Sequence, residues 1–312
     1  MKVAVIEPLG VEKELLEELA AGLLPAVTLE YFASKTTDTD ELISRGADAD
    51  IVVLSNLPLS AEVVSGWKNL KMIAVAFTGV DHIPLAFCRE NNICVCNCAG
   101  YSTASVSELV FGMLISFYRN LAACDAAVRS GKTKDGLIGF ELEGKKFGVV
   151  GTGAIGMRVL SIAQAFGCET YAYSRTGKDI PGVTYTDLET LLSVCDIVSL
   201  HVPLTDDTRG LIHAGNIGLM KKNAVLVNTA RGPVVDSAAL ASALHSQQIA
   251  GACIDVFDTE PPLDTDTPLL QAKNVCAAPH IGFASCEALQ KRAVMVFENI
   301  QAFLDGTPKN RV

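Results

Sequence analysis

The sequence predicts an α/β protein built from two open domains with parallel sheets. Short apolar runs alternate with helical patterns over the first hundred residues, and a second alternating series starts at residue 146, after one long helical pattern. Such alternation is typical of parallel strands covered by helices. The chain has 312 residues, of which 49% are hydrophobic and 19% are charged. This length and composition suffice for two globular cores.

The first domain is predicted from four apolar runs that read as buried strands. These are KVAVI (2–6), IVVL (51–54), MIAVAF (72–77) and ICVC (93–96). Helical patterns lie between them at 12–23 and 60–67, and the last helix of the chain, 286–306, is expected to pack on this domain. We therefore predict one domain from residues 1–100 plus 284–312, and a second from residues 101–283.

The second domain starts with a helical pattern over 102–131, which Ser102 or Thr103 can cap and which Gly131 ends. Six strand candidates follow, at 146–151, 170–174, 196–202, 224–230, 252–257 and 275–280. Parallel strands with helices between them predict a doubly wound sheet of the Rossmann kind.

Composition excludes several classes of partner. The net charge of −10 argues against nucleic acid, whose phosphates require a basic surface. No apolar stretch reaches the roughly 18 residues that span a bilayer, and no export signal precedes the first strand, so a cytoplasmic location and no membrane partner are expected. The ten cysteines are then expected to be reduced, with Cys94, Cys96 and Cys98 as core residues on one face of a strand. No metal site is predicted.

A glycine-rich loop predicts the site of a dinucleotide. VVGTGAIG has the pattern G-x-G-x-x-G, follows an apolar strand and opens a helix. The glycines permit a tight turn, close approach of backbone amides to a pyrophosphate, and close packing of helix on strand. The candidate cofactor contacts in this loop are Gly151, Thr152, Gly153, Ala154, Ile155 and Gly156.

The end of the next strand indicates which dinucleotide is preferred. A carboxylate there would accept the ribose hydroxyls and repel a 2′-phosphate, but ETYAYSRTGK has Ser174 at that position. Arg175 can form two hydrogen bonds to a phosphate, and Ser174 and Thr176 add hydroxyl donors. We therefore predict NADP as the preferred cofactor. The alternative is a solvated turn in an enzyme that uses NAD.

Three later strand ends carry an arginine, a glutamate and a histidine. They are NTARGPVVD with Arg231, IDVFDTEPP with Glu260, and APHIGFAS with His280. Together with VGTGAIG and HVPLTDDTRGLI, these segments resemble the D-isomer-specific 2-hydroxyacid dehydrogenase family. FTGVDHI and NCAGYSTASVSE extend the resemblance over essentially the whole chain.

The resemblance implies a flavodoxin-like substrate domain, a dinucleotide-binding domain and three catalytic roles. Reduction of a 2-oxo acid needs a hydride, a proton for the forming alkoxide and a clamp for the carboxylate. His280 is expected to be the acid/base, Glu260 to orient it and favour its charged form, and Arg231 to bind the substrate. A guanidinium can both hold a carboxylate and polarise a carbonyl.

Further positions are implied with less force, and structural roles remain an alternative for them. The predicted cofactor contacts are His201, Val202, Pro203, Thr208, Thr229 and Asp255, of which Asp255 resembles the residue that holds the nicotinamide carboxamide. The predicted substrate contacts, besides Arg231, are the backbone amides of Thr78 and Gly79 and the side chains of Tyr101 and Phe283. The family also forms dimers through the region of the long helix, so a homodimer is expected.

The expected activity is NADPH-linked reduction of glyoxylate, hydroxypyruvate or a similar 2-oxo acid to a D-2-hydroxy acid. Phe283 follows the HIG motif, where the family more often has a small residue. It could narrow the pocket toward small substrates or stack on an aromatic one. Two alternatives remain: an NAD-linked dehydrogenase of larger 2-oxo acids, and a dinucleotide-sensing protein that resembles a corepressor.

Overall fold

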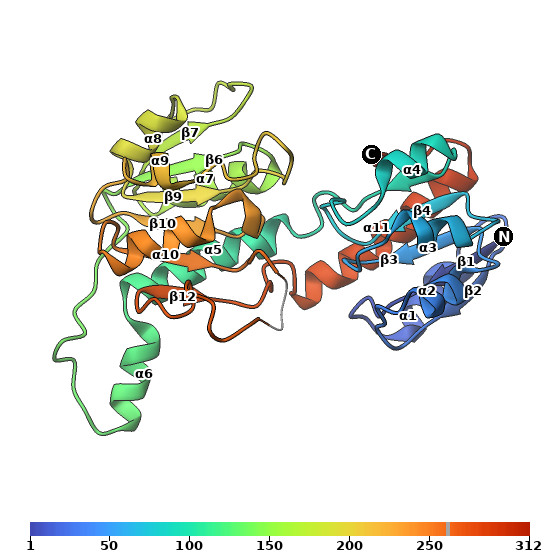
Figure 1. The fold of residues 1–312 in the computed structure, drawn as a ribbon, viewed down its shortest axis with the longest axis horizontal. Coiled ribbons are helices and arrows are strands. Elements are labelled where there is room, and N and C mark those ends of the chain that lie inside the picture. The colour runs from blue at the N-terminus through green and yellow to red at the C-terminus, as the bar shows by residue number, and fades with distance from the viewer. Residues whose placement is uncertain (260–262) are drawn as a thin grey trace. The chain divides into compact units, whose positions relative to one another are not determined.

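The computed structural model describes residues 1–259 and 263–312, and Glu260 lies outside them. The chain folds as two compact units, Met1–Ser102 with Ala284–Val312, and Thr103–Phe283. Each unit is a parallel α/β sheet with helices on its faces (Figure 1). The predicted fold class is confirmed.

The sheet of the first unit has five parallel strands in the order β2-β1-β3-β4-β5, which is the flavodoxin-like order. The strands are β1 (Lys2–Val5), β2 (Thr28–Tyr31), β3 (Ile51–Leu54), β4 (Met72–Val75) and β5 (Cys94–Cys96). The sequence prediction missed β2 because its residues are exposed or half-buried, so it lacks an apolar run. It lies at the edge of the sheet.

Five helices belong to the first unit. They are α1 (Lys13–Ala21), α2 (Thr39–Gly46), α3 (Ala61–Gly66), α4 (Leu85–Glu90) and α11 (Cys286–Leu304). The hydroxyl of Ser285 caps α11 by accepting from the amide of Ala288. One face of α11 is buried against α1 and β4, so the last helix of the chain completes the core of this unit.

Over its described residues, the second unit has a sheet of seven strands in the order β12-β11-β10-β9-β6-β7-β8, all paired in parallel. They are β6 (Lys146–Val150), β7 (Glu169–Tyr173), β8 (Val183–Tyr185), β9 (Ile197–Leu200), β10 (Val225–Asn228), β11 (Gly251–Ile254) and β12 (Val275–Ala277). The order reverses between β6 and β9, and doubly wound sheets bind ligands beyond such a switch point. The prediction of six strands omitted β8, a three-residue edge strand without fully buried side chains.

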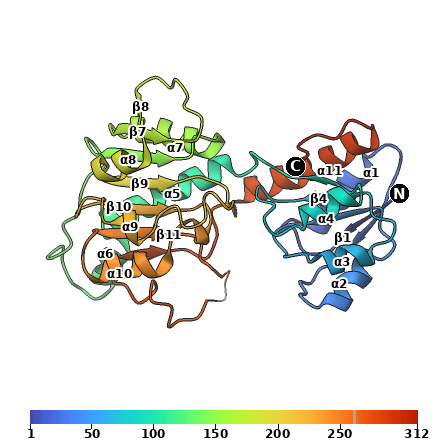
Figure 2. The ribbon, with the colours of Figure 1, turned by 45° about the horizontal axis from the view of Figure 1, so that its top comes forward.

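Helices cover both faces of this second sheet (Figure 2). The long helix α5 (Thr103–Tyr118) and α7 (Ala154–Ala165) pack together over one face. On the other face lie α8 (Leu188–Val194), α9 (Ala214–Ile217) and α10 (Ser237–His245). Successive residues of β9 and β10 alternate between the two cores, as the two-residue period of a strand requires.

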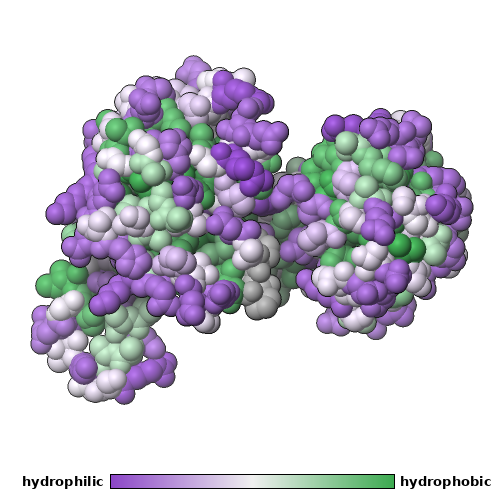
Figure 3. Space-filling view, viewed as in Figure 1, coloured by the Kyte–Doolittle hydropathy of each residue, from purple (hydrophilic) through white to green (hydrophobic). Residues whose placement is uncertain are grey.

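The single helix predicted over 102–131 is wrong. The structure ends α5 at Tyr118 and starts α6 (Leu121–Arg129) after Asn120, whose φ of 52° is left-handed. Asparagine tolerates this conformation better than most residues. None of the residues of α6 is buried, and hydrophobic side chains show on the surface of this segment (Figure 3). The apolar pattern over 102–131 is uniform, so it did not indicate the break between α5 and α6.

Cysteines are unbridged in the structure, and Cys94, Cys96 and Cys98 are buried as predicted. The Sγ atoms of Cys94 and Cys96 lie 3.7 Å apart, closer than the spacing of their Cα positions alone suggests. Over residues 1–259 and 263–312, no group of three histidine, cysteine or acidic side chains is placed to hold a metal ion. Over the same residues, no helix has the length and hydropathy needed to span a membrane.

Candidate dinucleotide and catalytic site

The glycine loop between β6 and α7 has the geometry that its sequence predicts. Gly151 has a φ of 98°, and a Cβ built there would lie 2.5 Å from the carbonyl oxygen of His201. A Cβ on Gly156 would overlap the carbonyl of Gly151. Both positions therefore require glycine. Gly151 needs it for its positive φ and its close approach to His201 after β9, and Gly156 needs it because α7 packs closely on the loop.

Gly153 shows that the loop can accept a ligand. It is the N-cap of α7, makes no side-chain cap, and has nothing within 4 Å of its Cβ position among the described residues. The first N–H groups of a helix lack partners within the helix and carry partial positive charge, which suits a pyrophosphate. The residues present therefore fit a dinucleotide at this position.

The loop after β7 is bonded to the glycine loop. The hydroxyl of Thr152 donates to that of Ser174 at 3.0 Å, and Ser174 donates to the carbonyl of Thr176 at 2.7 Å. The ammonium of Lys178 donates to the carbonyl of Thr152 at 2.7 Å. Arg175 is exposed beside these contacts. The structure thus brings together the glycine loop and the three residues predicted to select the dinucleotide.

His201 lies beside the glycine loop, but its ring is engaged elsewhere. Its Nε2 lies 2.8 Å from the hydroxyl of Ser199, which is fully buried. Burial lowers the pKa of His201 to about 3, so the ring stays neutral. A contact between His201 and the cofactor would therefore involve its backbone, which adjoins Gly151. Ser199 was not predicted, because no sequence motif marks a hydrogen bond between Ser199 and His201, two residues further on.

The other predicted cofactor residues after β9 are Val202, Pro203 and Thr208, and they shape the loop that follows this strand. Val202 packs beside the Cβ position of Gly151. The hydroxyl of Thr208 donates to the carbonyl of Pro203 at 2.6 Å and accepts from the amide of Thr205 at 2.8 Å. These bonds fold residues 203–208 at the end of β9.

Arg231 is presented by a turn that Asn228 holds. The side chain of Asn228 is buried, donates to the carbonyl of Arg231 at 2.9 Å and accepts from the amide of Ala230 at 3.1 Å. The guanidinium of Arg231 donates to the carbonyl of Ala230 at 2.8 Å. Thr229 is buried on the same turn, and its hydroxyl has no hydrogen-bond partner among the described residues. Asn228 was missed, although an amide at the end of an apolar strand is a usable signal.

His280 lies on the turn that follows β12, next to the end of β11. Its ring packs edge-to-face on Phe283, with centroids 5.7 Å apart. Its amide donates to the carbonyl of Asp255 at 2.7 Å, and its φ is 57°. The structure therefore brings together His280, Phe283 and Asp255, whereas Glu260 lies outside the described residues.

The predicted substrate contacts of the first unit lie at the carboxyl ends of its strands. The hydroxyl of Thr78, just after β4, is buried and has no hydrogen-bond partner among the described residues, while its carbonyl accepts from the side chain of Asn97 at 2.7 Å. Gly79 is half-buried next to it. Tyr101 is buried under the guanidinium of Arg292, and burial raises the pKa of Tyr101 to about 12.

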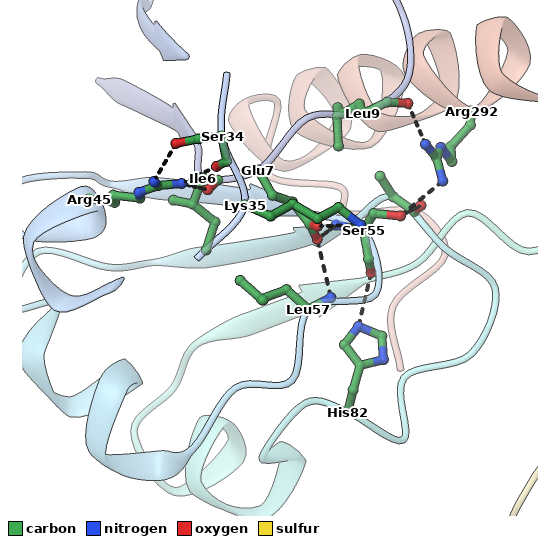
Figure 4. A network of polar contacts seen from close by, with 11 residues as sticks. Ile6, Glu7, Leu9, Ser34, Lys35, Arg45, Ser55, Leu57, His82 and Arg292 are labelled. Carbon is green, nitrogen blue, oxygen red and sulfur yellow. Dashed lines mark hydrogen bonds and ion pairs between the residues drawn. The ribbon is translucent and has the colours of Figure 1, made fainter. Parts of the chain in front are cut away.

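A buried polar network supports this edge of the first sheet (Figure 4). The carboxylate of Glu7 is fully buried and accepts from the amides of Ser55 and Leu57 at 2.6 and 3.1 Å. Arg292 donates to the hydroxyl of Ser55 at 2.9 Å, and the Nε2 of His82 lies 2.9 Å from the carbonyl oxygen of Ser55. The sequence did not predict this network, because these members come from four distant segments of the chain.

Known proteins resemble this chain in sequence and in fold. Residues 111–282 match the family model described as "D-isomer specific 2-hydroxyacid dehydrogenase, NAD binding domain". A hydroxypyruvate reductase of Thermotoga maritima is 39% identical, over 86% of this chain and 89% of its own. A glyoxylate reductase of Thermococcus litoralis is 40% identical, over 86% of this chain and 84% of its own. The structure of the acyclic imino acid reductase Bsp5, in complex with NADPH and D-Arg, superimposes with a TM-score of 0.92 at 28% identity, over the whole of both chains.

The doubly wound sheet and its glycine loop define the class as an α/β protein with an NAD(P)-binding domain. The chain belongs to the D-isomer-specific 2-hydroxyacid dehydrogenase family, and it is therefore an oxidoreductase. The family predicted from the sequence is confirmed.

Proposed function

We propose that the protein is an NADPH-linked reductase of small 2-oxo acids of the glyoxylate and hydroxypyruvate type, with D-2-hydroxy acids as products. The observation that carries the cofactor preference is the loop after β7, where Ser174 stands in place of a carboxylate and Arg175 is exposed next to it. The relatives named hydroxypyruvate reductase and glyoxylate reductase support the substrate class. The NADPH in the Bsp5 structure supports the cofactor.

Bound NADPH would supply the hydride, and residues of this chain would do the rest. The glycine loop would hold the pyrophosphate, with Arg175 at the 2′-phosphate. Arg231 would bind the substrate carboxylate and polarise its carbonyl, because a guanidinium has donors for both. His280 would give a proton to the forming alkoxide, and Glu260 would favour its charged form. Thr78, Gly79 and Tyr101 would complete the substrate contacts.

Steady-state kinetics with purified protein test the activity. We expect turnover of glyoxylate and hydroxypyruvate, a kcat/KM at least about tenfold higher with NADPH than with NADH, and a D-product on chiral chromatography. Faster turnover with NADH on branched or aromatic 2-oxo acids would instead support the NAD-linked alternative, in which Phe283 would stack on an aromatic substrate. His280→Ala should keep dinucleotide binding and lose turnover. If it retains turnover, the acid assignment is wrong.

We also propose that the protein is a homodimer whose subunits meet at α6 and the loop after it. Val128, Ile138 and Phe140 are 74%, 84% and 67% exposed on this segment, and surfaces of this kind mark interaction sites. The double variant V128D/I138D should sediment as a monomer in analytical ultracentrifugation, because burying two carboxylates opposes association. Leu219→Asp, at another exposed apolar position, is the control and should leave the dimer intact. Monomeric wild-type protein would refute this proposal.

A further inference from the structure

Asp255 makes three hydrogen bonds to three consecutive residues at the end of β12. Its backbone carbonyl accepts from the amide of His280 at 2.7 Å. Its carboxylate accepts from the amide of Ile281 through Oδ1 and from that of Gly282 through Oδ2, both at 2.8 Å. The residue is 1% exposed. A buried carboxylate thus uses both oxygens to hold the backbone of one short turn.

His280 has an unusual backbone conformation at the start of this turn. Its φ of 57° is left-handed, which residues with a side chain seldom adopt, although histidine does so more often than most. Such conformations persist where the surrounding structure over-determines them, and they concentrate at active sites. The backbone conformation fixes the direction of the Cα–Cβ bond, so it limits the positions that the imidazole ring can reach.

We propose that Asp255 is the positioning residue of His280, holding its backbone in the left-handed conformation from which the ring is aimed. This inference rests on the proposed function only in treating His280 as the acid. It goes beyond the carboxamide contact that the family resemblance implies, because both carboxylate oxygens accept hydrogen bonds from backbone amides of this turn. The two roles predict different changes when the carboxylate is altered.

Gly282 offers a second way to disturb the same turn. A Cβ on Gly282 would lie 2.9 Å from Oδ2 of Asp255. The carbonyl of Gly282 accepts a hydrogen bond from the hydroxyl of Ser105 at 2.6 Å. Gly282→Ala should therefore push the turn away from the carboxylate while leaving the chemistry of Asp255 intact. It separates an effect on the turn from the loss of a group that touches the cofactor.

The experiment compares Asp255→Asn and Gly282→Ala with a matched control. Asparagine presents an N–H₂ group to one of the two amides, so one bond is replaced by two opposed donors. With saturating NADPH and glyoxylate, we expect kcat to fall by about 100-fold in Asp255→Asn and by at least about tenfold in Gly282→Ala, since small misplacements of a catalytic group have effects of this size. The Kd for NADPH, from fluorescence titration, should change by less than about threefold in both. Asp196→Asn is the control, since that carboxylate also holds a backbone amide in this unit but precedes β9; it should keep kcat.

A readout without turnover distinguishes failure of this proposal from failure of the proposed function. The ring signals of His280, assigned in NMR spectra by their loss in His280→Gln, should move in Asp255→Asn and Gly282→Ala but not in Asp196→Asn. Unmoved signals would overturn the proposal. So would a large rise in the Kd for NADPH with kcat preserved, because this result would assign Asp255 to the nicotinamide. A wild-type protein inactive on every 2-oxo acid would refute the proposed function alone.

Discussion

The ammonium of Lys178 donates to the backbone carbonyl of Thr152 at 2.7 Å and so joins the loop after β7 to the glycine loop. The hydroxyl of Thr152 bonds to Ser174 at the same place. Thr152 is therefore held on both sides by residues of the neighbouring loop. We conclude that the segments proposed to bind the pyrophosphate and the adenosine ribose form one pre-organised surface.

Lys178→Met should weaken binding of both dinucleotides to a similar extent. The substitution keeps most of the length of the side chain and removes the bond that anchors the loop. Because Lys178 is exposed, we expect a modest loss of about 1 kcal/mol, or about fivefold in the Kd for NADPH and for NADH alike. Isothermal titration calorimetry measures both constants. A loss confined to NADPH would instead place this ammonium on the 2′-phosphate.

Arg175→Ala should give the opposite pattern, with NADPH affected far more than NADH. Each charge-assisted hydrogen bond from a guanidinium to a phosphate contributes about 1.5–3 kcal/mol, so we expect the Kd for NADPH to rise by about 10- to 100-fold. NADH lacks the 2′-phosphate and should bind almost unchanged. Equal losses for the two dinucleotides would show that Arg175 plays no part in selecting between them.

How much the sequence could predict depended on how local each signal was. Interior strands such as β3 and β4 are buried on both faces and are continuous apolar runs in the sequence, so their existence and parallel pairing followed directly. The edge strands β2 and β8 are half-exposed and lack that signal. The glycine loop was predictable because a turn, a strand end and a helix start coincide in six residues. Contacts between distant segments, such as those of Asp255 with residues 280–282 or of Lys178 with Thr152, leave no local pattern.

The neutral ring of His201 should make the folded protein sensitive to acid. Burial lowers its pKa to about 3 in the folded state, whereas an unfolded histidine titrates near 6.5. Above pH 6.5 both states hold a neutral ring and nothing is lost. As the pH falls below 6.5, the unfolded state takes up a proton that the folded state does not, so the free energy of unfolding decreases.

A neutral substitute for His201 tests this linkage. Since His201 keeps part of its surface exposed, we expect it to account for about 2 kcal/mol of the stability lost between pH 7 and pH 4.5. His201→Gln can still bond to Ser199 but does not titrate, so its stability should fall less over this interval. Urea unfolding at the two pH values measures the difference. Equal losses in the variant and the wild type would show that the ring is protonated in the folded protein.

Phe283 should limit the size of the substrate. Its ring packs edge-to-face on His280 at 5.7 Å, so a substrate that receives a proton from His280 must fit beside it. Phe283→Ala removes this bulk, and we expect the ratio of kcat/KM for 2-oxoisocaproate to that for glyoxylate to rise by about tenfold or more. Phe283→Leu, which fills much of the same volume, is the control and should stay close to the wild type. If Phe283 instead stacks on an aromatic substrate, both variants should selectively lose turnover of phenylpyruvate. Measuring phenylpyruvate beside the other two substrates therefore distinguishes a size limit from aromatic stacking.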